Sequence, residues 1–431
     1  MAQSTPTVFD AIVIGAGMAG LTAARRLAEA GKRTLLCEAS ERVGGRIWSA
    51  EGAGVELGAE FVHGEPKPTL ALAREAGIAL IPLQDRHFMK HGSDFRELGD
   101  LWQLFASVLG RLEPGDDDVT AQAFVAKQGI DPDTTERFRQ LVEGFEAAPF
   151  DEVSIRSLAT DSQSVTEDDA QFRVDGGYGR LIDFQRERAR AAGTELRSNS
   201  AVRCIEWHLN GPVVLGFDAP LPALTSKTCV VAVPLGALQG DDALRVDPAI
   251  MSWQKPLQRL AMGHACRYTF ELPLDFARSA APRNAFIHHP PSLFEAAWSR
   301  ETAQSVLWTV WAGGPKAIRL ARESSSERQQ LAAGALAALL TVPEASLLTA
   351  LLRPPGTHDF SNDPHILGAY SFSRPGGARD SEALAAPIGD ALFMAGEATD
   401  HEYPGTVAGA IASGERAARQ AIAALERRPR A

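Results

Sequence analysis

Cysteine is scarce in this chain. Only four of its 431 residues are cysteines, Cys37, Cys204, Cys229 and Cys266, and no two have the spacing of a metal-binding Cys-x-x-Cys pair. Cys37 and Cys229 lie in apolar runs typical of strands, and a chain of this length does not need a disulfide framework. We therefore expect four reduced cysteines in the core, and we predict no metal site.

Long apolar runs are also missing. No uninterrupted apolar stretch reaches the roughly 18 residues that a membrane-spanning helix needs. The chain starts with a polar, mixed segment and finishes with the polar sequence ERRPRA. We expect neither a signal peptide nor a tail anchor, and hence a soluble, cytoplasmic protein with no membrane partner.

Basic residues are outnumbered. There are 43 Lys and Arg against 54 Asp and Glu, which gives a formal net charge of −11. Binding to nucleic acid needs a basic surface, so we expect no nucleic acid partner. An acidic protein suits a cationic small substrate, although solubility explains the same charge more simply.

The first clear motif is a glycine triplet near the N-terminus. The apolar run FDAIVIGAG is typical of a buried parallel strand, MAGLTAARRLAEAG has helical spacing ending at Gly31, and RTLLCE is a second strand. Gly15, Gly17 and Gly20 form G-x-G-x-x-G between the first strand and the helix. Glu38 ends the second strand, where a carboxylate can accept the ribose hydroxyls of a dinucleotide. This βαβ context predicts a dinucleotide site but does not distinguish NAD from FAD.

The residues after Glu38 favour FAD. Gly44 and Gly45 allow the backbone to approach a ligand closely, and Arg46 can pair with a pyrophosphate. Gly58 and Ala59, in the run VELGAEFVHG, leave room for a flat ring system. An NAD dehydrogenase would normally use this region for an ordinary helix and strand.

The rest of the chain alternates between helical and strand patterns. Amphipathic helices are predicted in PTLALAREAG, GDLWQLFASVLGRLE and DTTERFRQLVEGFEAA, and strands in AVRCIEW and TCVVAV. GHACRYTFELP and QSVLWTVWAG alternate like strands of an antiparallel sheet. ALFMAGEAT predicts another strand, and a long helix closes the chain. This order predicts one domain built from three separated pieces, with a second domain inserted twice.

Two segments at opposite ends carry a family resemblance. The run from Gly15 to Gly64 and the segment FMAGEATDHEYPGTVAGAIASGERAA resemble the flavin-containing amine oxidases, which include monoamine oxidases, polyamine oxidases and lysine-specific histone demethylases. In the middle, AVRCIEW and VVAVPLGAL resemble the following strands of that family. The stretch from Leu70 to Asp175 has no specific motif, so we expect it to determine substrate identity.

The resemblance implies an α/β fold with non-covalent FAD. A Rossmann-like FAD-binding domain with a parallel sheet would comprise residues 1–70, 176–255 and 380–431. An α+β substrate domain with a mixed or antiparallel sheet and helices would comprise 71–175 and 256–379. Glu397 would bond the ribityl chain, the backbone at Val202 would hold adenine, and Thr406 and Val407 would meet the flavin ring. The full set of implied FAD-binding residues is Gly15, Gly17, Met18, Ala19, Gly20, Glu38, Ala39, Gly45, Arg46, Gly58, Ala59, Glu60, Phe61, Val202, Gly396, Glu397, Thr406 and Val407.

The implied reaction is amine oxidation. Hydrogen equivalents leave the carbon next to a neutral nitrogen, the imine hydrolyses, and oxygen or another acceptor reoxidises the flavin. The protein would desolvate and orient the substrate, because the flavin performs the difficult step. An apolar pocket would help a cationic amine to lose its proton.

The pattern breaks at a position where the family usually has a lysine. That lysine follows a glycine by four residues and holds a water near the flavin; here Gly263 is followed by Arg267. Arginine keeps the charge but has a different shape and does not release its proton. Arg267 is a candidate catalytic residue, and the alternatives are a surface strand residue or a partner for a buried acid.

Three further residues complete the candidate catalytic set. Tyr370 is retained beside the expected flavin, while Phe360 replaces a family tryptophan. Thr406 stands where monoamine oxidases have a tyrosine, and no cysteine lies near Tyr370 to bond the flavin covalently. His63 matches a histidine that faces substrate in some polyamine oxidases, although a hydrogen-bonded structural histidine is equally consistent.

Two other functions remain open from the sequence. One is a desaturase or an enzyme of the protoporphyrinogen oxidase type, which the acidic chain and its closing motif disfavour. The other is a flavin-binding protein that has lost catalysis, which the substitutions at Arg267 and Phe360 favour. The sequence determines neither the amine, nor the electron acceptor, nor the oligomeric state.

Overall fold

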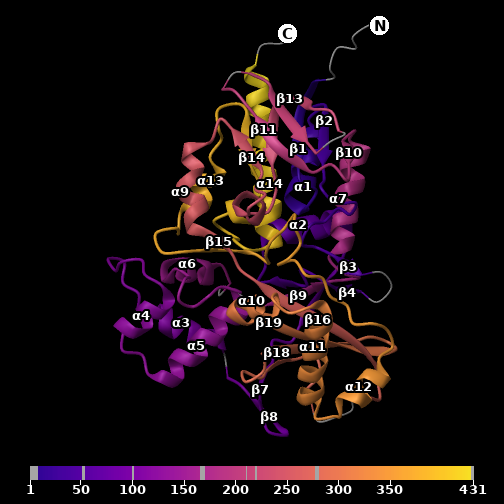
Figure 1. The fold of residues 1–431 in the computed structure, drawn as a ribbon, viewed down its shortest axis with the longest axis vertical. Coiled ribbons are helices and arrows are strands. Elements are labelled where there is room, and N and C mark those ends of the chain that lie inside the picture. The colour runs from indigo at the N-terminus through magenta and orange to yellow at the C-terminus, as the bar shows by residue number, and fades with distance from the viewer. Residues whose placement is uncertain are drawn as a thin grey trace.

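The computed structural model describes residues 8–50, 54–99, 101–165, 170–209, 211–218, 221–276 and 281–428. Its elements form two halves (Figure 1). One half contains both ends of the described chain and a largely parallel sheet. The other contains an antiparallel sheet beside a group of helices.

The first half is built on an eight-stranded sheet. In spatial order its strands are β10 (Glu195–Arg197), β2 (Thr34–Cys37), β1 (Val8–Ile14), β13 (Leu224–Val231), β12 (Val213–Phe217), β11 (Val202–Glu206) and β14 (Arg245–Asp247), with β21 (Leu392–Met394) paired to β13. β1 pairs in parallel with both β2 and β13, which confirms the predicted βαβ unit. Ala11, Ile12 and Val13 are fully buried because both faces of the sheet are covered.

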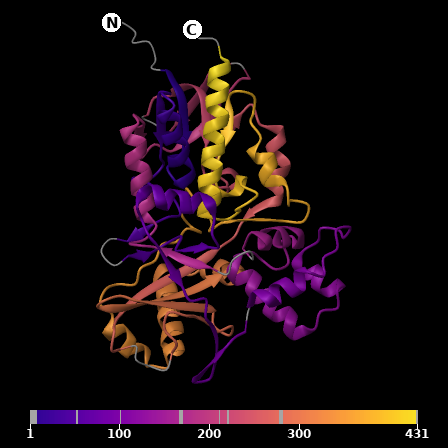
Figure 2. The same cartoon turned by 180° about the vertical axis from the view of Figure 1, so that it is seen from behind.

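Four helices pack on one face of this sheet. They are α1 (Met18–Glu29), α2 (Lys67–Ala76), α7 (Gly179–Ala191) and α14 (Val407–Arg427). Seen from behind, α14 from the C-terminus runs beside α1 from the N-terminus (Figure 2). The last helix of the chain thus completes the layer that the first helix begins. α8 (Gly236–Gln239), α9 (Met251–Arg259), α13 (Asp380–Ala385) and a short 3₁₀ helix at Glu397–Thr399 complete this half.

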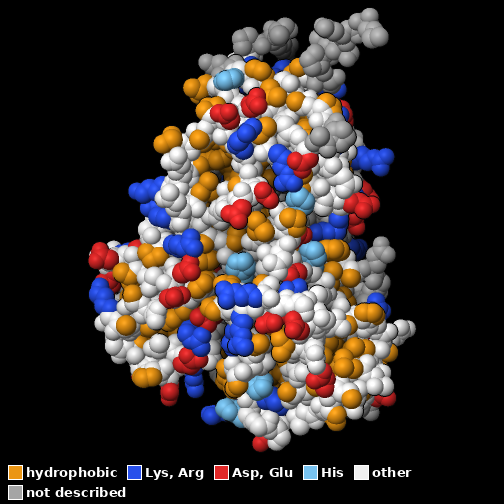
Figure 3. Space-filling model, viewed as in Figure 1, with side chains coloured by type: hydrophobic (Ala, Val, Ile, Leu, Met, Phe, Trp, Pro, Cys, Tyr) orange, Lys and Arg blue, Asp and Glu red, His pale blue; other side chains and the backbone are white. Residues whose placement is uncertain are grey.

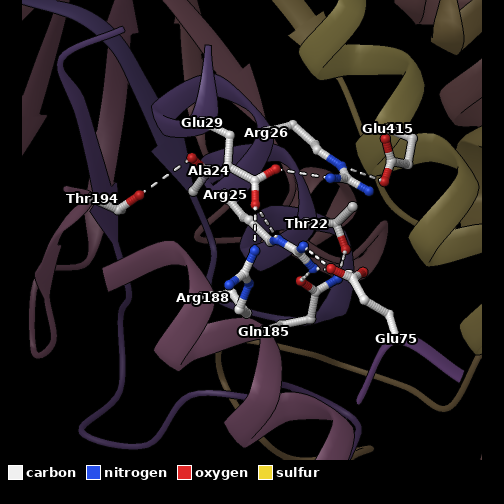
Figure 4. Close-up of polar contacts among 10 residues, drawn as sticks. All are labelled: Thr22, Ala24, Arg25, Arg26, Glu29, Glu75, Gln185, Arg188, Thr194 and Glu415. Carbon is white, nitrogen blue, oxygen red and sulfur yellow. Dashed lines mark hydrogen bonds and ion pairs between the residues drawn. The ribbon is translucent and has the colours of Figure 1, made fainter. Parts of the chain in front are cut away.

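A buried arginine joins three of these helices (Figure 4). Arg25 on α1 is 2% exposed and bonds Glu29 on its own helix, Glu75 on α2 and Gln185 on α7. Its neighbour Arg26 reaches Glu415 on α14 at 2.7 Å. Because a buried guanidinium needs several acceptors, this network determines how the helices sit together.

The second half combines a sheet with two groups of helices. The sheet order is β16 (Ala265–Pro273), β19 (Ser305–Gly313), β18 (Ala296–Glu301), β17 (Phe286–His288), β7 (His87–His91) and β8 (Asp94–Glu97). β16 and β19 pair antiparallel over their whole length, as predicted from their alternation. The helices are α3 (Leu101–Leu109), α4 (Ala121–Lys127), α5 (Pro132–Phe145), α6 (Ile155–Val165), α10 (Gly314–Leu320), α11 (Ser325–Leu340) and α12 (Glu344–Ala350).

Three small sheets lie where the halves meet. They pair β3 (Ser49–Ala50) with β4 (Val55–Glu56), β15 (Leu260–Met262) with β20 (Ser371–Ser373), and β5 (Phe61–His63) with β9 (Gln171–Val174) and β6 (Leu80–Leu83). The sheet of β5, β9 and β6 crosses the predicted boundary at residue 70. The division of the chain into domains remains our proposal.

The surface is mixed in charge. In the view of Figure 3, acidic and basic side chains are interspersed rather than gathered by sign. Within the described ranges, no single helix is long and apolar enough to cross a bilayer, and one bent pair, Ser325–Leu340 with Glu344–Ala350, passes that test of length and composition. The four cysteines are all free thiols; Cys37 and Cys229 are buried, while Cys204 and Cys266 are partly exposed.

Candidate active site

One cavity of about 1060 Å³ runs from the glycine triplet into the second half. Its volume is at the upper end of the roughly 300–1,000 Å³ typical of ligand pockets. Every residue proposed from the sequence to bind FAD lines it except Gly20, and so do the candidate catalytic residues His63, Arg267, Tyr370 and Thr406. Residues from both ends of the chain therefore share one space.

The glycine turn shows why Gly20 is not part of the wall. A Cβ on Gly20 would lie 1.8 Å from the carbonyl oxygen of Gly15, so this glycine lets α1 pack on the turn. Gly15 has a φ of +96°, a conformation that favours glycine. A Cβ on Gly17 would meet no protein atom within 4 Å, so the space before it is open. The turn thus presents bare backbone to the cavity at the start of α1, which suits a pyrophosphate.

Glu38 is held at the end of β2 by the turns around it. Its carboxylate accepts from the backbone N–H of Ala16 at 2.7 Å and from the N–H and hydroxyl of Ser40 at 3.0 and 2.9 Å. These bonds set the carboxylate against the cavity wall. They leave lone pairs for a ribose hydroxyl, because an ionised carboxylate has about four acceptor sites.

Arg46 and Glu397 form an ion pair across 351 residues of sequence. Arg46 Nη1 lies 2.7 Å from Glu397 Oε1 and also donates to the carbonyl of Ala369. Glu397 is 4% exposed and accepts from the hydroxyl of Ser371 at 2.6 Å and the N–H of Gly405 at 3.1 Å. Glu397 therefore joins the segments that contain Arg46, Ser371 and Gly405. The sequence assigned it only to the ribityl chain, so this positioning role was not predicted.

The last helix begins at the cavity. Thr406 is the N-cap of α14, and its hydroxyl accepts from the N–H of Gly409 at 3.1 Å. Val407 follows it on the cavity wall. The helix N-terminus places positive partial charge there, which favours an anionic ligand group.

Arg267 belongs to a buried charge cluster. It is 5% exposed, and its guanidinium donates to the carbonyl of Gly58 at 2.8 Å and to Glu60 Oε2 at 2.7 Å. Arg173 binds the other carboxylate oxygen of Glu60 at 2.8 Å. Burial raises the pKa of Glu60, but the two guanidinium groups outweigh it and hold that pKa at about 2. Arg267 thus both faces the cavity and partners a buried acid.

Tyr370 and Phe360 line the same cavity. The hydroxyl of Tyr370 donates to the carbonyl of Phe145. Burial, with Glu146 adding to it, raises the pKa of Tyr370, so the phenol keeps its proton. Phe360 is 8% exposed, and its ring lies 3.3 Å from where a Cβ on Gly58 would be. A Cβ on Gly58 would also lie 1.9 Å from the carbonyl oxygen of Arg46, so backbone and the Phe360 ring together confine Gly58 in the region where a flat ring is expected.

His63 lies among aromatic rings. Its ring centroid is 5.2 Å from that of Phe145 and 6.0 Å from that of Phe61. Burial lowers the pKa of His63 to about 4, so the ring is neutral near pH 7. Its Nδ1 has no hydrogen-bond partner among the described residues, which leaves that atom for a ligand or a water.

The sequence reasoning missed most of the chamber beyond Arg267. Phe286, Trp298 and Trp311 come from three adjacent strands and line the cavity with Phe61. The expectation placed substrate identity between Leu70 and Asp175, yet residues 286–311 supply much of this wall. Trp298 in AAWSRE and Trp311 in LWTVW, on neighbouring strands, are the signal that could have revealed it.

A histidine pair was missed as well. His87 on β7 and His288 on β17 lie side by side with a ring nitrogen distance of 2.9 Å, and both line the cavity. Over the residues that the structure describes, no group of three or more His, Cys, Asp or Glu could hold a metal ion.

The wall residues fit a dinucleotide. The open backbone at Gly17, the carboxylate of Glu38 and the start of α14 all line one cavity, and they suit a pyrophosphate, a ribose and a flavin ring respectively. The contacts of each residue with the cofactor remain proposals.

Known proteins support this interpretation. The family described as flavin containing amine oxidoreductase matches residues 18–422. Lysine-specific histone demethylase 2 of Homo sapiens is 27% identical over 94% of this chain and 52% of its own length. Polyamine oxidase 3 of Oryza sativa subsp. japonica is 26% identical over 95% of this chain and 88% of its own. The chain thus spans about half the length of the demethylase it matches.

Solved structures share the fold. Putrescine oxidase bound to putrescine superimposes with a TM-score of 0.79 at 18% identity, covering 97% of this chain and 100% of that one. Cyclohexylamine oxidase from Brevibacterium oxydans IH-35A gives 0.78 at 21% identity, covering 98% and 100%. These matches confirm the predicted fold class, and the family match confirms FAD as the cofactor. The chain belongs to the flavin-containing amine oxidoreductase family.

Proposed function

We propose that this protein is an FAD-dependent oxidase of a small amine. The amine loses two electrons and two hydrogens, one from the carbon next to the nitrogen and one from the nitrogen itself, and becomes an imine. Water then hydrolyses the imine to a carbonyl compound and a free amine. Bound FAD would supply the two-electron acceptor, and oxygen or another acceptor would restore it.

The observation that carries the proposal is the continuity of the cavity. The glycine turn and Glu38 stand at one end, and an aromatic chamber from a different sheet stands at the other. A cofactor along the first part would meet a substrate in the second. Family membership supports the reaction type, and the acidic net charge of −11 is compatible with a cationic substrate.

The chamber can prepare an amine for oxidation. Its rings exclude water, and a low-polarity site lowers the pKa of a bound ammonium, so the substrate enters the reaction as the neutral amine. His63 is neutral near pH 7 and its Nδ1 is unpartnered, so it can accept an amine proton. Arg267 is committed to Gly58 and Glu60, so we assign it to positioning the wall rather than to proton transfer.

The test is an amine panel on the purified yellow protein. Anaerobic mixing with a substrate should bleach the flavin absorbance, and aerobic turnover should produce peroxide or reduce a dye. Acid precipitation should release all colour, since the FAD is non-covalent. A yellow protein that no amine bleaches would favour the alternative of a flavin-binding protein without catalysis, which the bonding of Arg267 to Gly58 and Glu60 already suggests as the second candidate.

The electron acceptor is tested separately. The family's lysine can hold a water at the flavin and assist oxygen, whereas Arg267 fills that position with a group bonded to Glu60. We expect slow reoxidation by oxygen, with a dye serving better. When the reduced enzyme is mixed with oxygen by stopped flow, the flavin of Arg267→Lys should be reoxidised faster than that of wild type. Equal rates would show that Arg267 does not tune oxygen reactivity.

A further inference from the structure

The strands of the second sheet align their cavity-facing side chains in a row. Six residues, one on each strand, are paired in register with the next, and all six line the cavity. Strand by strand, the row is Arg267, Trp311, Ala296, His288, Met89 and Arg96. Neighbouring strands are about 4.8 Å apart, so three strand steps separate Arg267 from His288 by about 14 Å. Each step along the row therefore corresponds to a known distance along the chamber, counted from Arg267, which contacts Gly58.

The far part of this row contains a chain of hydrogen bonds. Asp85 Oδ1 lies 2.9 Å from His87 Nε2, and His87 Nδ1 lies 2.9 Å from His288 Nε2. Gln171 donates to the same oxygen of Asp85 at 2.9 Å. The ring of His87 also stacks on Phe286, with centroids 5.0 Å apart. Asp85 and His87 are each held from two sides, which fixes the orientation of the ring that bonds His288.

The carboxylate determines which ring nitrogens carry protons. Burial raises the pKa of Asp85, but hydrogen bonds from His87 and Trp102 outweigh it and lower that pKa, so Asp85 is ionised. An ionised carboxylate accepts the proton on His87 Nε2. With its Nε2 carrying that proton, His87 accepts at Nδ1 from His288 Nε2–H. His288 Nδ1 is left as a hydrogen-bond acceptor without a protein partner among the described residues.

Burial keeps His288 neutral as well. It lowers the pKa of His288 to about 3, with the neighbouring His87 adding to the effect. The negative charge of Asp85 still polarises the neutral His288 ring through the hydrogen bonds of His87. This arrangement suits a cationic N–H donor better than an anion or a neutral acceptor.

Between Arg267 and His288 the row consists of Trp311 and Ala296. In the adjacent row Trp298 and Phe286 pack with Phe61, with ring centroids between 5.3 and 6.0 Å apart, so this part of the wall is largely aromatic. Aromatic walls suit a methylene chain and also attract a cation passing over them. A ligand that reaches from one end to the other is therefore a flexible chain with polar groups only at its ends.

We propose that His288, oriented by His87 and Asp85, accepts a hydrogen bond from the second amino group of an elongated aliphatic diamine whose first amino group is oxidised near Arg267. The inference rests on the proposed function, because it names the substrate class of the same site. His288 is then a specificity residue, and His87 and Asp85 are positioning residues.

The experiment compares α,ω-diamines of increasing length with monoamines of matched length. It is run at about pH 8.5, where unperturbed histidines are neutral and alkylamines are still protonated. The wild-type ratio of kcat/KM for diamine over monoamine should pass through a maximum at one chain length. His288→Leu should lower that ratio about tenfold to a hundredfold, mainly through KM, because a hydrogen bond to a charged group is lost. The kcat/KM of the matched monoamine, measured for each variant, is the internal reference for its ratio.

Two further variants separate recognition from structure. His87→Phe keeps the stacking on Phe286 but removes both ring hydrogen bonds, and it should lower the diamine preference less than His288→Leu does. Met89→Leu changes the adjacent position of the row without touching a hydrogen bond, and it should affect diamines and monoamines alike. FAD absorbance and the monoamine rate report whether each variant is folded.

Binding is also measured without turnover. Calorimetric titration of the reduced holoenzyme with the optimal diamine should show tighter binding than with the matched monoamine, and His288→Leu should abolish the difference. Equal binding in wild type, or a preference that survives His288→Leu, overturns the inference while leaving amine oxidation standing. A protein that no amine bleaches but that binds diamines through His288 would instead contradict only the proposed reaction.

Discussion

The two ends of the cavity are built in different ways. At the nucleotide end, the wall is largely backbone, set by glycines and by carboxylates that cap turns, as in the bond from Ala16 to Glu38. In the chamber, the wall consists of side chains from strands that are distant in sequence, such as Phe61, Trp298 and Arg267. The first end recognises a ligand through geometry shared by many nucleotide-binding proteins, and the second through side chains particular to this chain.

The comparison shows where substitutions should act. A residue at the nucleotide end either permits a backbone path or prevents it, so errors there should be severe. In the chamber a side chain can be exchanged if no buried charge is left alone. Each prediction below tests one side of this contrast.

The largest effect is expected at the glycine turn. Gly20→Ala would place a Cβ 1.8 Å from the carbonyl oxygen of Gly15, and backbone cannot move aside as a side chain can. We expect no folded, yellow protein. Gly17→Ala is the matched control, because its Cβ would meet no protein atom within 4 Å. It should fold but bind FAD more weakly, as measured by flavin content and circular dichroism.

Either half of this prediction can fail by itself. Gly20→Ala with the thermal midpoint of wild type would show that the close packing of α1 is not needed. Gly17→Ala with unchanged FAD affinity would show that the pyrophosphate does not lie in front of Gly17.

The chamber should be most sensitive at its buried charges. Arg267→Leu removes one of the two guanidinium groups that donate to Glu60 and leaves Arg173 in place. Breaking a buried ion pair costs about 3–5 kcal/mol, and we expect the lower end because one partner remains. Arg203→Leu is the control: its pair with Asp218 at 2.8 Å is exposed, so the cost should stay below about 1 kcal/mol. Urea unfolding followed by circular dichroism measures both, and equal destabilisation would contradict the contrast.

A third prediction concerns the junction of the two ends. Glu397→Ala removes the acceptor for Arg46, Ser371 and Gly405. Charge-assisted hydrogen bonds are worth about 1.5–3 kcal/mol, so FAD affinity should fall about tenfold to a hundredfold. Glu382→Ala removes an equally charged but exposed side chain and should leave the affinity unchanged. Flavin fluorescence titration decides between them, and a fall shared by both variants would point to net charge as the cause.

The smallest effect is a pH dependence from His63. Its pKa is about 4 in the folded protein against an ordinary 6.5, so between these values the unfolded chain binds more protons. Stability is therefore full above pH 6.5 and is lost as the pH falls towards 4. Between pH 6.5 and 5.5, the shifted pKa of His63 lowers the free energy of unfolding by about 1 kcal/mol. His63→Gln should reduce the fall in unfolding free energy over that interval by this amount, and an unchanged slope would mean that the folded protein charges this ring readily.

Much of the nucleotide end could be predicted from the sequence because its determinants are local. Gly15, Gly17 and Glu38 lie within a single βαβ unit, and the order of strand, helix and strand follows from apolar periodicity. GHACRYTFELP and QSVLWTVWAG were predicted as strands of an antiparallel sheet for the same reason, and the structure adds that they pair with each other. The distant FAD segment was found through its resemblance to a family rather than through any local physical signal.

The chamber could not be predicted because its neighbours are set by strand order. His87 and His288 are 201 residues apart, and only the parallel pairing of β7 with β17 brings their rings together. The same holds for Arg267 and Glu60, whose pairing explains a substitution that looked like a lost catalytic lysine.

The sequence by itself determined the nucleotide site and the family, since a phosphate-binding turn depends on the backbone freedom of a few adjacent residues. Only the tertiary structure decided what the chamber recognises. Burial and register there control which groups are charged, as the ionised Asp85 and the neutral His288 show, and those quantities depend on every strand packed around them.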